Sequence, residues 1–502
     1  MSSDPLPSPS KTEAEIRFDE TRRKIGIVLG PLMFLLVLVV PFESLTPDMH
    51  RLAAIMALVM VFWITEALPL PVTALLGPTL AIVLGVAPAA ETFRPFASTT
   101  IFLFIGSFIL AQALFVHRVN ERIAYGVLSM RIIGAHPTRI LIAYGLLAAF
   151  LSAWMSNTAT AAMLVPIGMT LVRFMESEAH IPKKYGTALM LMTTYCCSRG
   201  GMATPVGTPP NLIAIGMISD QLDVRITFVQ WMLFSLPIVL VLMAIVFVYL
   251  SWVGQTGVDE IPGTERIIAE RKAALGPWRR GEINAVIAFS VTVVLWIGPG
   301  ILALILGTDH PVVNAVTSSI PAAVAALVGV VLLFVLPNSK TEHSTITWKQ
   351  AAQIDWGTIL LFGGGLALGA LAASTGLARV IAVGITGLVP LNEVAAVTFA
   401  GAIFTVVLSE AMSNTAATNI AIPIVISIAQ AAGVNPIIPA VASALAASVA
   451  AVLPVSTPPN AIVYASGRVS ITDMIKYGLL MDVTAVTLVP VLVLFFAPFF
   501  IT

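Results

Sequence analysis

Two short polar motifs with the chemistry to bind ions interrupt long apolar stretches, and one repeats the other. Residues 155–159 read Met-Ser-Asn-Thr-Ala, and residues 412–416 read the same, 257 residues further on. Ser, Asn and Thr are preferred helix N-cap residues, because their side-chain oxygens accept hydrogen bonds from free backbone N–H groups. Three of them in succession within an apolar segment predict that the helix stops and restarts there.

Each Ser-Asn-Thr motif has a companion further along the chain. Thr-Pro-Pro-Asn occurs at residues 208–211 and again at residues 457–460. Proline lacks an N–H group and interrupts a helix, and Asn211 and Asn460 can cap the helix that follows. One such motif alone fits a kinked helix with satisfied polar side chains. Four motifs in two matching pairs instead predict two repeats that form a transport site where they meet.

The chemistry of these motifs suits ions of both signs. Restarted helices expose N–H groups that carry partial positive charge, where a carboxylate can bind. The breaks also leave backbone carbonyls, which together with Ser, Asn and Thr oxygens suit a small hard cation. No Lys or Arg lies within the four motifs, so neutral groups alone would leave a bound dianion badly desolvated. One bound cation per repeat would offset that charge, which favours cation-coupled transport of a dianion.

Composition places the motifs in a membrane. Of the 502 residues, 58% are hydrophobic and only 10% are charged, whereas soluble proteins carry about 25% charged residues. Apolar runs of about 20 residues, the length of a membrane-spanning helix, recur along the chain. We therefore expect an all-α polytopic membrane protein. The net charge of zero indicates no nucleic-acid partner, and the adjacent Cys196 and Cys197 fit neither a disulfide framework nor a zinc site.

The pattern of apolar and charged residues divides the chain into two repeats. Residues 1–24 are rich in Ser, Pro and charge, which predicts a disordered tail. Basic residues at its end, just before the first apolar run, predict a cytoplasmic N-terminus. The first repeat covers residues 25–252 and the second covers residues 283–502. A charged linker, residues 253–282, separates them.

Each repeat is expected to contain a re-entrant hairpin and a broken helix, at residues 98–228 and 351–475. Residues 100–115 and 358–373 are apolar but short for a membrane span, which favours hairpins at these places. The sequence thus predicts about 11 transmembrane helices plus two hairpins. An odd number of spans in each half would make the repeats inverted.

These motifs, together with Trp-Ile-Thr-Glu-Ala-Leu-Pro-Leu-Pro-Val-Thr-Ala-Leu at residues 63–75, resemble the divalent anion/sodium symporter family. That family includes the sodium–dicarboxylate and sodium–citrate cotransporters, and the resemblance covers nearly the whole chain. It implies a homodimer in the plasma (inner) membrane. Each protomer would have a scaffold domain, with helices in residues 25–97 and 283–350, and a transport domain that moves like an elevator. Thr-Pro-Pro is typical of the bacterial dicarboxylate branch.

The resemblance also implies roles for individual residues. Substrate contacts are implied for Ser156, Asn157, Thr208, Pro209, Ser413, Asn414, Thr415, Thr457 and Pro458. A first sodium site is implied around Ser152, Ser156, Asn157 and Gly207. A second is implied around Ser409, Met412, Asn414 and Ser456, partly through backbone carbonyls. Sodium would serve as the coupling ion, and no other cofactor is implied.

Two charged residues need separate interpretations. Arg199 stands where the family resemblance leads us to expect a small or apolar residue. We expect it to extend to water at the membrane interface, while the alternative is that it supplies positive charge near the site. Glu410, three residues before Ser413, is implied to be a structural group near the second cation site, with proton coupling as the alternative.

The favoured function is a sodium-coupled symporter of C4-dicarboxylates in the succinate, malate and fumarate class. A sodium-independent dicarboxylate exchanger, or a citrate or sulfate carrier of the same family, remains open. A channel for anions or cations, a different class of protein, would show no counterflow and no saturation at modest substrate concentration. An enzyme is disfavoured, because no Ser/His/Asp set, metal cluster or paired carboxylates lie at the motifs.

Overall fold

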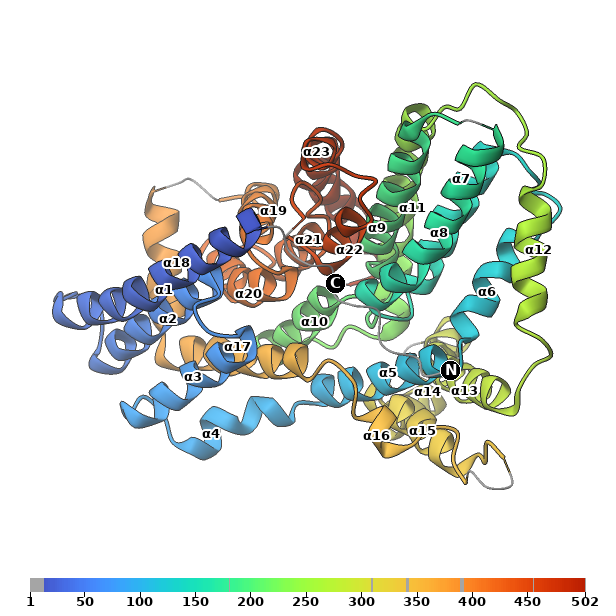
Figure 1. Cartoon of the computed structure of the whole chain (residues 1–502). Helices are drawn as coiled ribbons and strands as arrows, with labels where there is room; N and C mark the ends of the chain where they lie inside the picture. The colour runs from blue at the N-terminus through green and yellow to red at the C-terminus, as the bar shows by residue number, and fades with distance from the viewer. Residues whose placement is uncertain are drawn as a thin grey trace.

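The computed structural model describes residues 13–179, 181–307, 310–339, 343–388, 392–454 and 456–501, and these contain helices but no strand (Figure 1). In chain order the elements are α1 (Glu13–Val39), α2 (Pro47–Thr65), α3 (Leu70–Val83), α4 (Ala89–Phe93), η1 (Arg94–Ala97), α5 (Thr99–Val116), α6 (Val119–Leu128), α7 (Pro137–Ser152), α8 (Asn157–Ala179), α9 (Lys183–Gly201), α10 (Pro209–Leu222), α11 (Phe228–Val253), α12 (Thr264–Ala274), α13 (Arg280–Leu306), α14 (Pro311–Ser319), α15 (Ala322–Val335), α16 (Trp348–Ala351), α17 (Trp356–Thr375), α18 (Leu377–Leu388), α19 (Val394–Ala411), α20 (Asn414–Ala431), α21 (Ile437–Ala447), α22 (Pro458–Ala465), α23 (Ile471–Phe496) and η2 (Ala497–Phe499).

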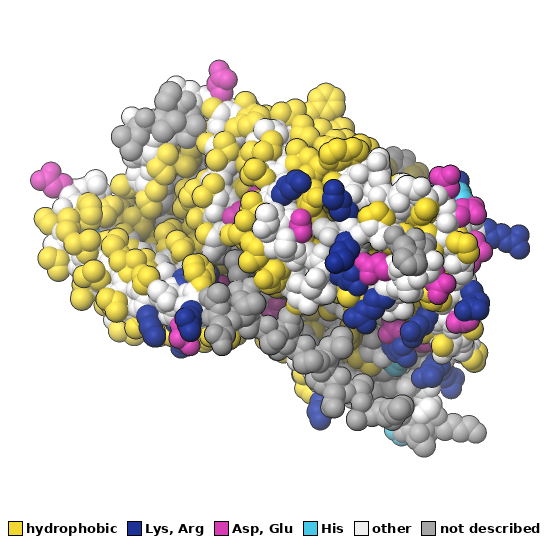
Figure 2. Space-filling model, turned by 45° about the horizontal axis from the view of Figure 1, so that its top comes forward, with side chains coloured by type: hydrophobic (Ala, Val, Ile, Leu, Met, Phe, Trp, Pro, Cys, Tyr) yellow, Lys and Arg dark blue, Asp and Glu magenta, His cyan; other side chains and the backbone are white. Residues whose placement is uncertain are grey.

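Length and composition make this a multi-pass membrane fold. Within the described ranges, eight helices are long and apolar enough to cross a membrane, or nine if the bent pair α14–α15 counts as one span. The sequence led us to expect about 11, and the numbers differ because several apolar helices, such as α7 and α21, have only 10 to 17 residues. Apolar side chains such as Val248 and Leu304 are exposed at the surface, where lipid would cover them. Figure 2 shows hydrophobic side chains over the left and upper parts of one face and charged ones gathered toward the right.

The helices break where the four polar motifs lie. Helix α7 ends at Ser152 and α8 begins at Asn157, and in the second half α19 ends at Ala411 and α20 begins at Asn414. Helices α10 and α22 begin at the first proline of their Thr-Pro-Pro-Asn motifs. The predicted interruptions are therefore confirmed at all four motifs.

The two halves interlock. Helix α10 of the first half packs against α20 of the second, and α22 of the second half packs against α8 of the first. Figure 1 shows α10 and α22 near the middle of the molecule. This exchange explains why motifs far apart in the sequence meet.

The segments predicted as hairpins also cross between the halves. Helix α5 packs against α15, where Gly106 leaves room for Ala326, and α17 packs against α3, where Gly364 lies against the backbone of Ala74. A side chain at either glycine would collide with that neighbour, so close helix packing accounts for the glycines in these segments. Both α5 and α17 are continuous helices long enough to span a membrane, and their re-entrant arrangement stays a prediction.

The N-terminal prediction needs correction. Disorder was expected over residues 1–24, but α1 begins at Glu13, so that expectation is wrong from there to Lys24; residues 1–12 lie outside the described residues. Charged side chains stabilise this stretch as a helix, because Arg22 forms ion pairs with Asp19 and with Glu66, which directly follows α2. Within the predicted linker, residues 253–282, the structure has helix α12 and the start of α13 at Arg280.

Candidate functional site

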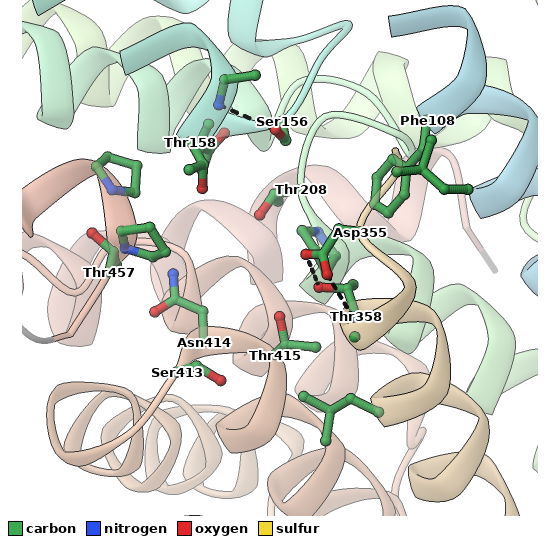
Figure 3. Close-up of a pocket in the computed structure, with 18 of the residues that line it drawn as sticks. Phe108, Ser156, Thr158, Thr208, Asp355, Thr358, Ser413, Asn414, Thr415 and Thr457 are labelled. Carbon is green, nitrogen blue, oxygen red and sulfur yellow. Dashed lines mark hydrogen bonds between the residues drawn. The ribbon is translucent and has the colours of Figure 1, made fainter. Parts of the chain in front are cut away.

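One pocket collects residues from all four motifs. Its volume is about 750 Å³, within the range of small-molecule sites. Its motif residues are Ser156, Asn157, Thr158, Ala159, Thr208, Pro209, Pro210, Ser413, Asn414, Thr415, Thr457, Pro458 and Pro459, and the neighbouring Ser456 also lines it. Figure 3 shows the labelled Ser, Thr and Asn side chains of both halves around one shared space. The nine residues implied as substrate contacts thus all line the same pocket.

The first Ser-Asn-Thr motif starts α8 through its own side chains. The Ser156 hydroxyl accepts a hydrogen bond from the N–H of Ala159 at 3.2 Å, which satisfies one free donor of the new helix. Ser152, the last residue of α7, donates to Asn157 Oδ1 at 2.5 Å. The Asn157 oxygen is therefore held across the break between the two helices.

The second motif repeats these contacts. The Ser413 hydroxyl accepts from the N–H of Ala416 at 3.2 Å, and Ser409 donates to Asn414 Oδ1 at 2.7 Å. The Ser409 hydroxyl also lies 2.8 Å from the carbonyl oxygen of Ala447, at the end of α21. Each half thus orients the amide oxygen of one Asn beside a helix start.

The Thr-Pro-Pro-Asn motifs hold the neighbouring backbone by a mechanism that the sequence did not indicate. Asn211 and Asn460 do not cap the following helix; they lie in its first turn and donate back to carbonyls of the preceding segment. Asn211 Nδ2 lies 2.9 Å from the Gly201 oxygen and 2.8 Å from the Thr204 oxygen. Asn460 Nδ2 lies 3.1 Å from the Leu453 oxygen. These bonds fix the irregular segments that line the pocket.

Oxygen atoms converge behind the first motif, where a cation site was implied. A Cβ built on Gly207 would lie 2.5 Å from the Gly201 oxygen and 2.9 Å from the Ser152 oxygen. A Cβ on Gly201 would lie 2.5 Å from Asn157 Oδ1 and 3.1 Å from the Gly207 oxygen. The backbone can approach this closely only because both residues are glycine. Three carbonyl oxygens and one amide oxygen therefore lie close to these two glycines, and neutral oxygens are the ligand type that hard cations prefer.

The residues implied for the second cation site lie around the break before α20 and in the segment before α22. Ser409 bonds to Asn414, and Met412 lies in the break that precedes α20. Ser456, in the irregular segment before α22, accepts a hydrogen bond from Asn460 Nδ2 at 3.1 Å. Asn414 and Ser456 line the pocket itself. The residues implied for the two cation sites thus offer neutral oxygens, and the sites themselves stay a prediction.

The charge of the pocket agrees with this chemistry. Asp355 is the one charged residue among the described residues that line it, and no Lys or Arg does so. An anion in the pocket therefore has helix starts, hydroxyls and amides for partners, but no side-chain cation. One bound cation in each repeat would supply the missing positive charge.

Arg199 is not where we expected it. Its side chain is 1% exposed, so the expectation that it extends to interfacial water is wrong. It also does not line the pocket. Arg199 is buried because other helices pack around α9. Its guanidinium lies over the ring of Tyr195 and donates a hydrogen bond to the Tyr195 carbonyl at 3.3 Å.

Glu410 supports the segment that carries Ser456. Its Oε1 accepts from the N–H groups of Ala451 at 2.7 Å and Val452 at 3.2 Å. Both residues belong to the irregular segment between α21 and α22. This placement agrees with a structural role near the second cation site.

Sequence reasoning missed the part of the pocket that lies outside the motifs. Phe108 and Gln112 of α5, with Gln353 and Asp355 before α17, also line it. No repeated motif marks these positions, and only the packing of the helices brings them to the pocket. The available signal was the two short apolar segments, residues 100–115, which carry Phe108 and Gln112, and residues 358–373, which follow Gln353 and Asp355.

The family model and the similar sequences agree on one family of sodium-coupled anion transporters. A family model described as the sodium:sulfate symporter transmembrane region matches residues 23–501. A sodium-dependent dicarboxylate transporter, SdcS, of Staphylococcus saprophyticus is 32% identical over 487 residues, covering 94% of this chain and 91% of that protein. SdcS of Staphylococcus aureus is also 32% identical, over 494 residues and the same shares of both chains.

Solved structures share the fold at low sequence identity. The YdaH transporter of Alcanivorax borkumensis has a TM-score of 0.55 and 15% identity, with 96% of this chain and 97% of that one covered. MtrF of Neisseria gonorrhoeae has a TM-score of 0.57 and 13% identity, with 95% and 97% covered. At such identity the likeness concerns the fold alone.

Proposed function

The chain belongs to the divalent anion/sodium symporter family, and on that premise we propose that it moves C4-dicarboxylates across a membrane together with sodium ions. The observation that carries this proposal is the pocket lined by all four motifs, with no Lys or Arg among its described lining residues. The names of its relatives, sodium-dependent dicarboxylate transporters, support the same substrate and coupling ion.

The substrate would bind with one carboxylate at each half of the site. The starts of α8 and α20 provide free N–H groups with partial positive charge. Thr208 and Thr457 provide hydroxyls on either side. A four-carbon chain would place its carboxylates far enough apart to reach both helix starts. This division of contacts follows from the repeated construction of the pocket.

Two sodium ions would complete the site. One would bind among the carbonyls around Gly207 with Asn157, and the other near Ser409, Asn414 and Ser456. Their charges would offset the two charges of the substrate and so remove most of the cost of taking a dianion out of water. Each further positive charge that moves inward gains about 2.3 kcal/mol per 100 mV of membrane potential. Sodium therefore serves both as a structural partner of the anion and as the source of energy.

The division into domains follows the family pattern in this proposal. Helices in residues 25–97 and 283–350 would form the scaffold, and residues 98–228 and 351–475 would form an elevator-type transport domain with inverted repeats. The protein would act as a homodimer in the plasma membrane with a cytoplasmic N-terminus. Exposed apolar side chains, such as Val248 on α11, offer surface for lipid or a second protomer.

The decisive experiment is uptake of labelled succinate into liposomes that contain the purified protein. Inward gradients of sodium, potassium or protons are compared, with unlabelled succinate either preloaded or absent. Accumulation that requires inward sodium and no preload supports the symporter. Accumulation that requires preload and ignores sodium identifies an exchanger instead. If the protein transports citrate or sulfate but not succinate, its substrate is a different anion from the one proposed, within the same transporter family.

A further inference from the structure

The pocket has two chemically different sides. The Ser-Asn-Thr and Thr-Pro-Pro-Asn motifs form a neutral, hydrogen-bonding side. The rest of the lining is mixed: it contains the apolar Leu70, Phe108, Phe115 and Ile354, the neutral polar Gln112, Gln353 and Thr358, and one charged residue, Asp355. Figure 3 shows Asp355 across the space from Thr158 and Thr457, with Thr208 between them. A ligand held by the motifs thus has a carboxylate across the pocket.

Asp355 is fixed in place by the helix that it caps. Its Oδ1 accepts from the N–H of Thr358 at 3.0 Å, and its Oδ2 accepts from the Thr358 hydroxyl at 2.6 Å. Both oxygens are therefore oriented by Thr358 at the start of α17, although the group is exposed to the pocket solvent. The negative charge also offsets the partial positive charge of this helix start. The start of α17 consequently does not offer a further anion-binding end.

A fixed negative charge in a pocket that binds anions discriminates between anions of different charge. A dicarboxylate can direct both of its charges to the motifs and leave an uncharged part facing Asp355. A tricarboxylate of similar bulk has a third charge that the motifs cannot accommodate, and that charge would approach Asp355. Like charges within several ångströms in a partly hydrated pocket change binding by about tenfold. Among the described lining residues no Lys or Arg is present to offset this repulsion.

We propose that Asp355 is a specificity-determining residue that excludes tricarboxylate trianions from the pocket while admitting dicarboxylates. This inference rests on the proposed function and deepens it, since it states which anions the same site rejects. Asp355 acts through its charge, and its hydrogen bonds to Thr358 serve to hold that charge in position. Specificity against a competitor commonly comes from such a repulsive element.

The test compares two competitors that differ by one charge. Tricarballylate has a central carboxylate, and 3-methylglutarate has a methyl group in its place. Each is titrated as an inhibitor of sodium-driven succinate uptake in liposomes at mildly alkaline pH, where tricarballylate carries three charges. The measured quantity is the ratio of their inhibition constants, because differences in expression or turnover cancel in that ratio.

Asp355→Asn removes the charge and keeps the cap, since Asn is an equally good N-cap residue. We expect the ratio of the tricarballylate constant to the 3-methylglutarate constant to fall by about tenfold. The ratio isolates this effect, because any change in the affinity of the pocket for anions in general acts on both competitors. Asp355→Glu keeps the charge and should keep most of the discrimination. Asp48→Asn, which removes an exposed carboxylate at the start of α2, is the control for a remote change of charge.

An unchanged ratio in Asp355→Asn, with succinate uptake intact, would overturn the inference and leave the proposed function standing. Equal inhibition by both competitors in the unmodified protein would also overturn it, because there would be no discrimination to explain. If the unmodified protein shows no sodium-driven succinate uptake, the proposed function itself fails. In that case direct binding of the two competitors to purified protein, measured by calorimetry, still tests the role of Asp355.

Discussion

Substitution of Gly207 by Ala tests the first cation site directly. The added Cβ would lie 2.5 Å from the Gly201 oxygen and 2.9 Å from both Gly201 Cα and the Ser152 oxygen. Ordinary contacts begin at 3.4 Å, so these atoms must move apart by roughly half an ångström to one ångström. Forcing an extra methyl group into a close-packed site typically costs about 1–3 kcal/mol.

That cost falls on the geometry that binds the cation. The Gly201 and Ser152 carbonyls are the oxygens expected to face sodium, and both are neighbours of the new methyl group. If most of the strain opposes sodium binding, the sodium concentration for half-maximal uptake rises by roughly 5- to 150-fold. The succinate KM at saturating sodium should change much less.

The assay is labelled succinate uptake in liposomes over a series of sodium concentrations. Gly254→Ala is the matched control. Gly254 follows the end of α11, away from the pocket, and its added Cβ would lie 2.9 Å from the Cβ of Ala188. This variant should lower the thermal denaturation midpoint without altering the response to sodium. A folded Gly207→Ala protein with unchanged sodium dependence would refute the placement of the first cation site.

Three further predictions follow from the repeated contacts. Ser152→Ala and Ser409→Ala each remove the hydrogen bond that orients an Asn oxygen. Each should raise the sodium concentration for half-maximal uptake by about 2- to 12-fold. Equal responses to sodium in variant and unmodified protein would contradict this expectation. Thr208→Val removes a pocket hydroxyl and should raise the succinate KM by about tenfold, measured at saturating sodium; an unchanged KM would argue against contact with the substrate. Asn211→Ala and Asn460→Ala leave buried carbonyls without their hydrogen-bond donor. Each should lower the free energy of unfolding by about 1–3 kcal/mol, measured as a lower thermal midpoint in detergent. No change in that midpoint would contradict a structural role for these two residues.

The sequence predicted the local features of the site well, because the determinants are local. A Ser followed by Asn and Thr in an apolar run caps a helix wherever it lies, and the caps at Ser156 and Ser413 follow that rule. Repetition of the motifs then predicted that they meet, as the common pocket bears out.

Features that depend on distant contacts were harder to predict. The burial of Arg199 depends on the helices that enclose α9, and the sequence around it resembles an interfacial segment. The helix at Glu13–Lys24 is held partly by Glu66, more than 40 residues away. Asp355 belongs to none of the motifs. It lines the pocket because it caps the start of α17, and the position of that helix depends on distant contacts.

The exchange of helices between the two halves has a consequence for how the chain assembles. Helix α3 emerges early in synthesis, but its partner α17 follows it by more than 270 residues. Contacts that close such long loops slow folding, so the early helices must remain side by side in the membrane until the second half arrives. Neither half could complete its packing alone. Two fragments cut in the linker and produced together should therefore reassemble a working carrier, whereas either fragment alone would be degraded.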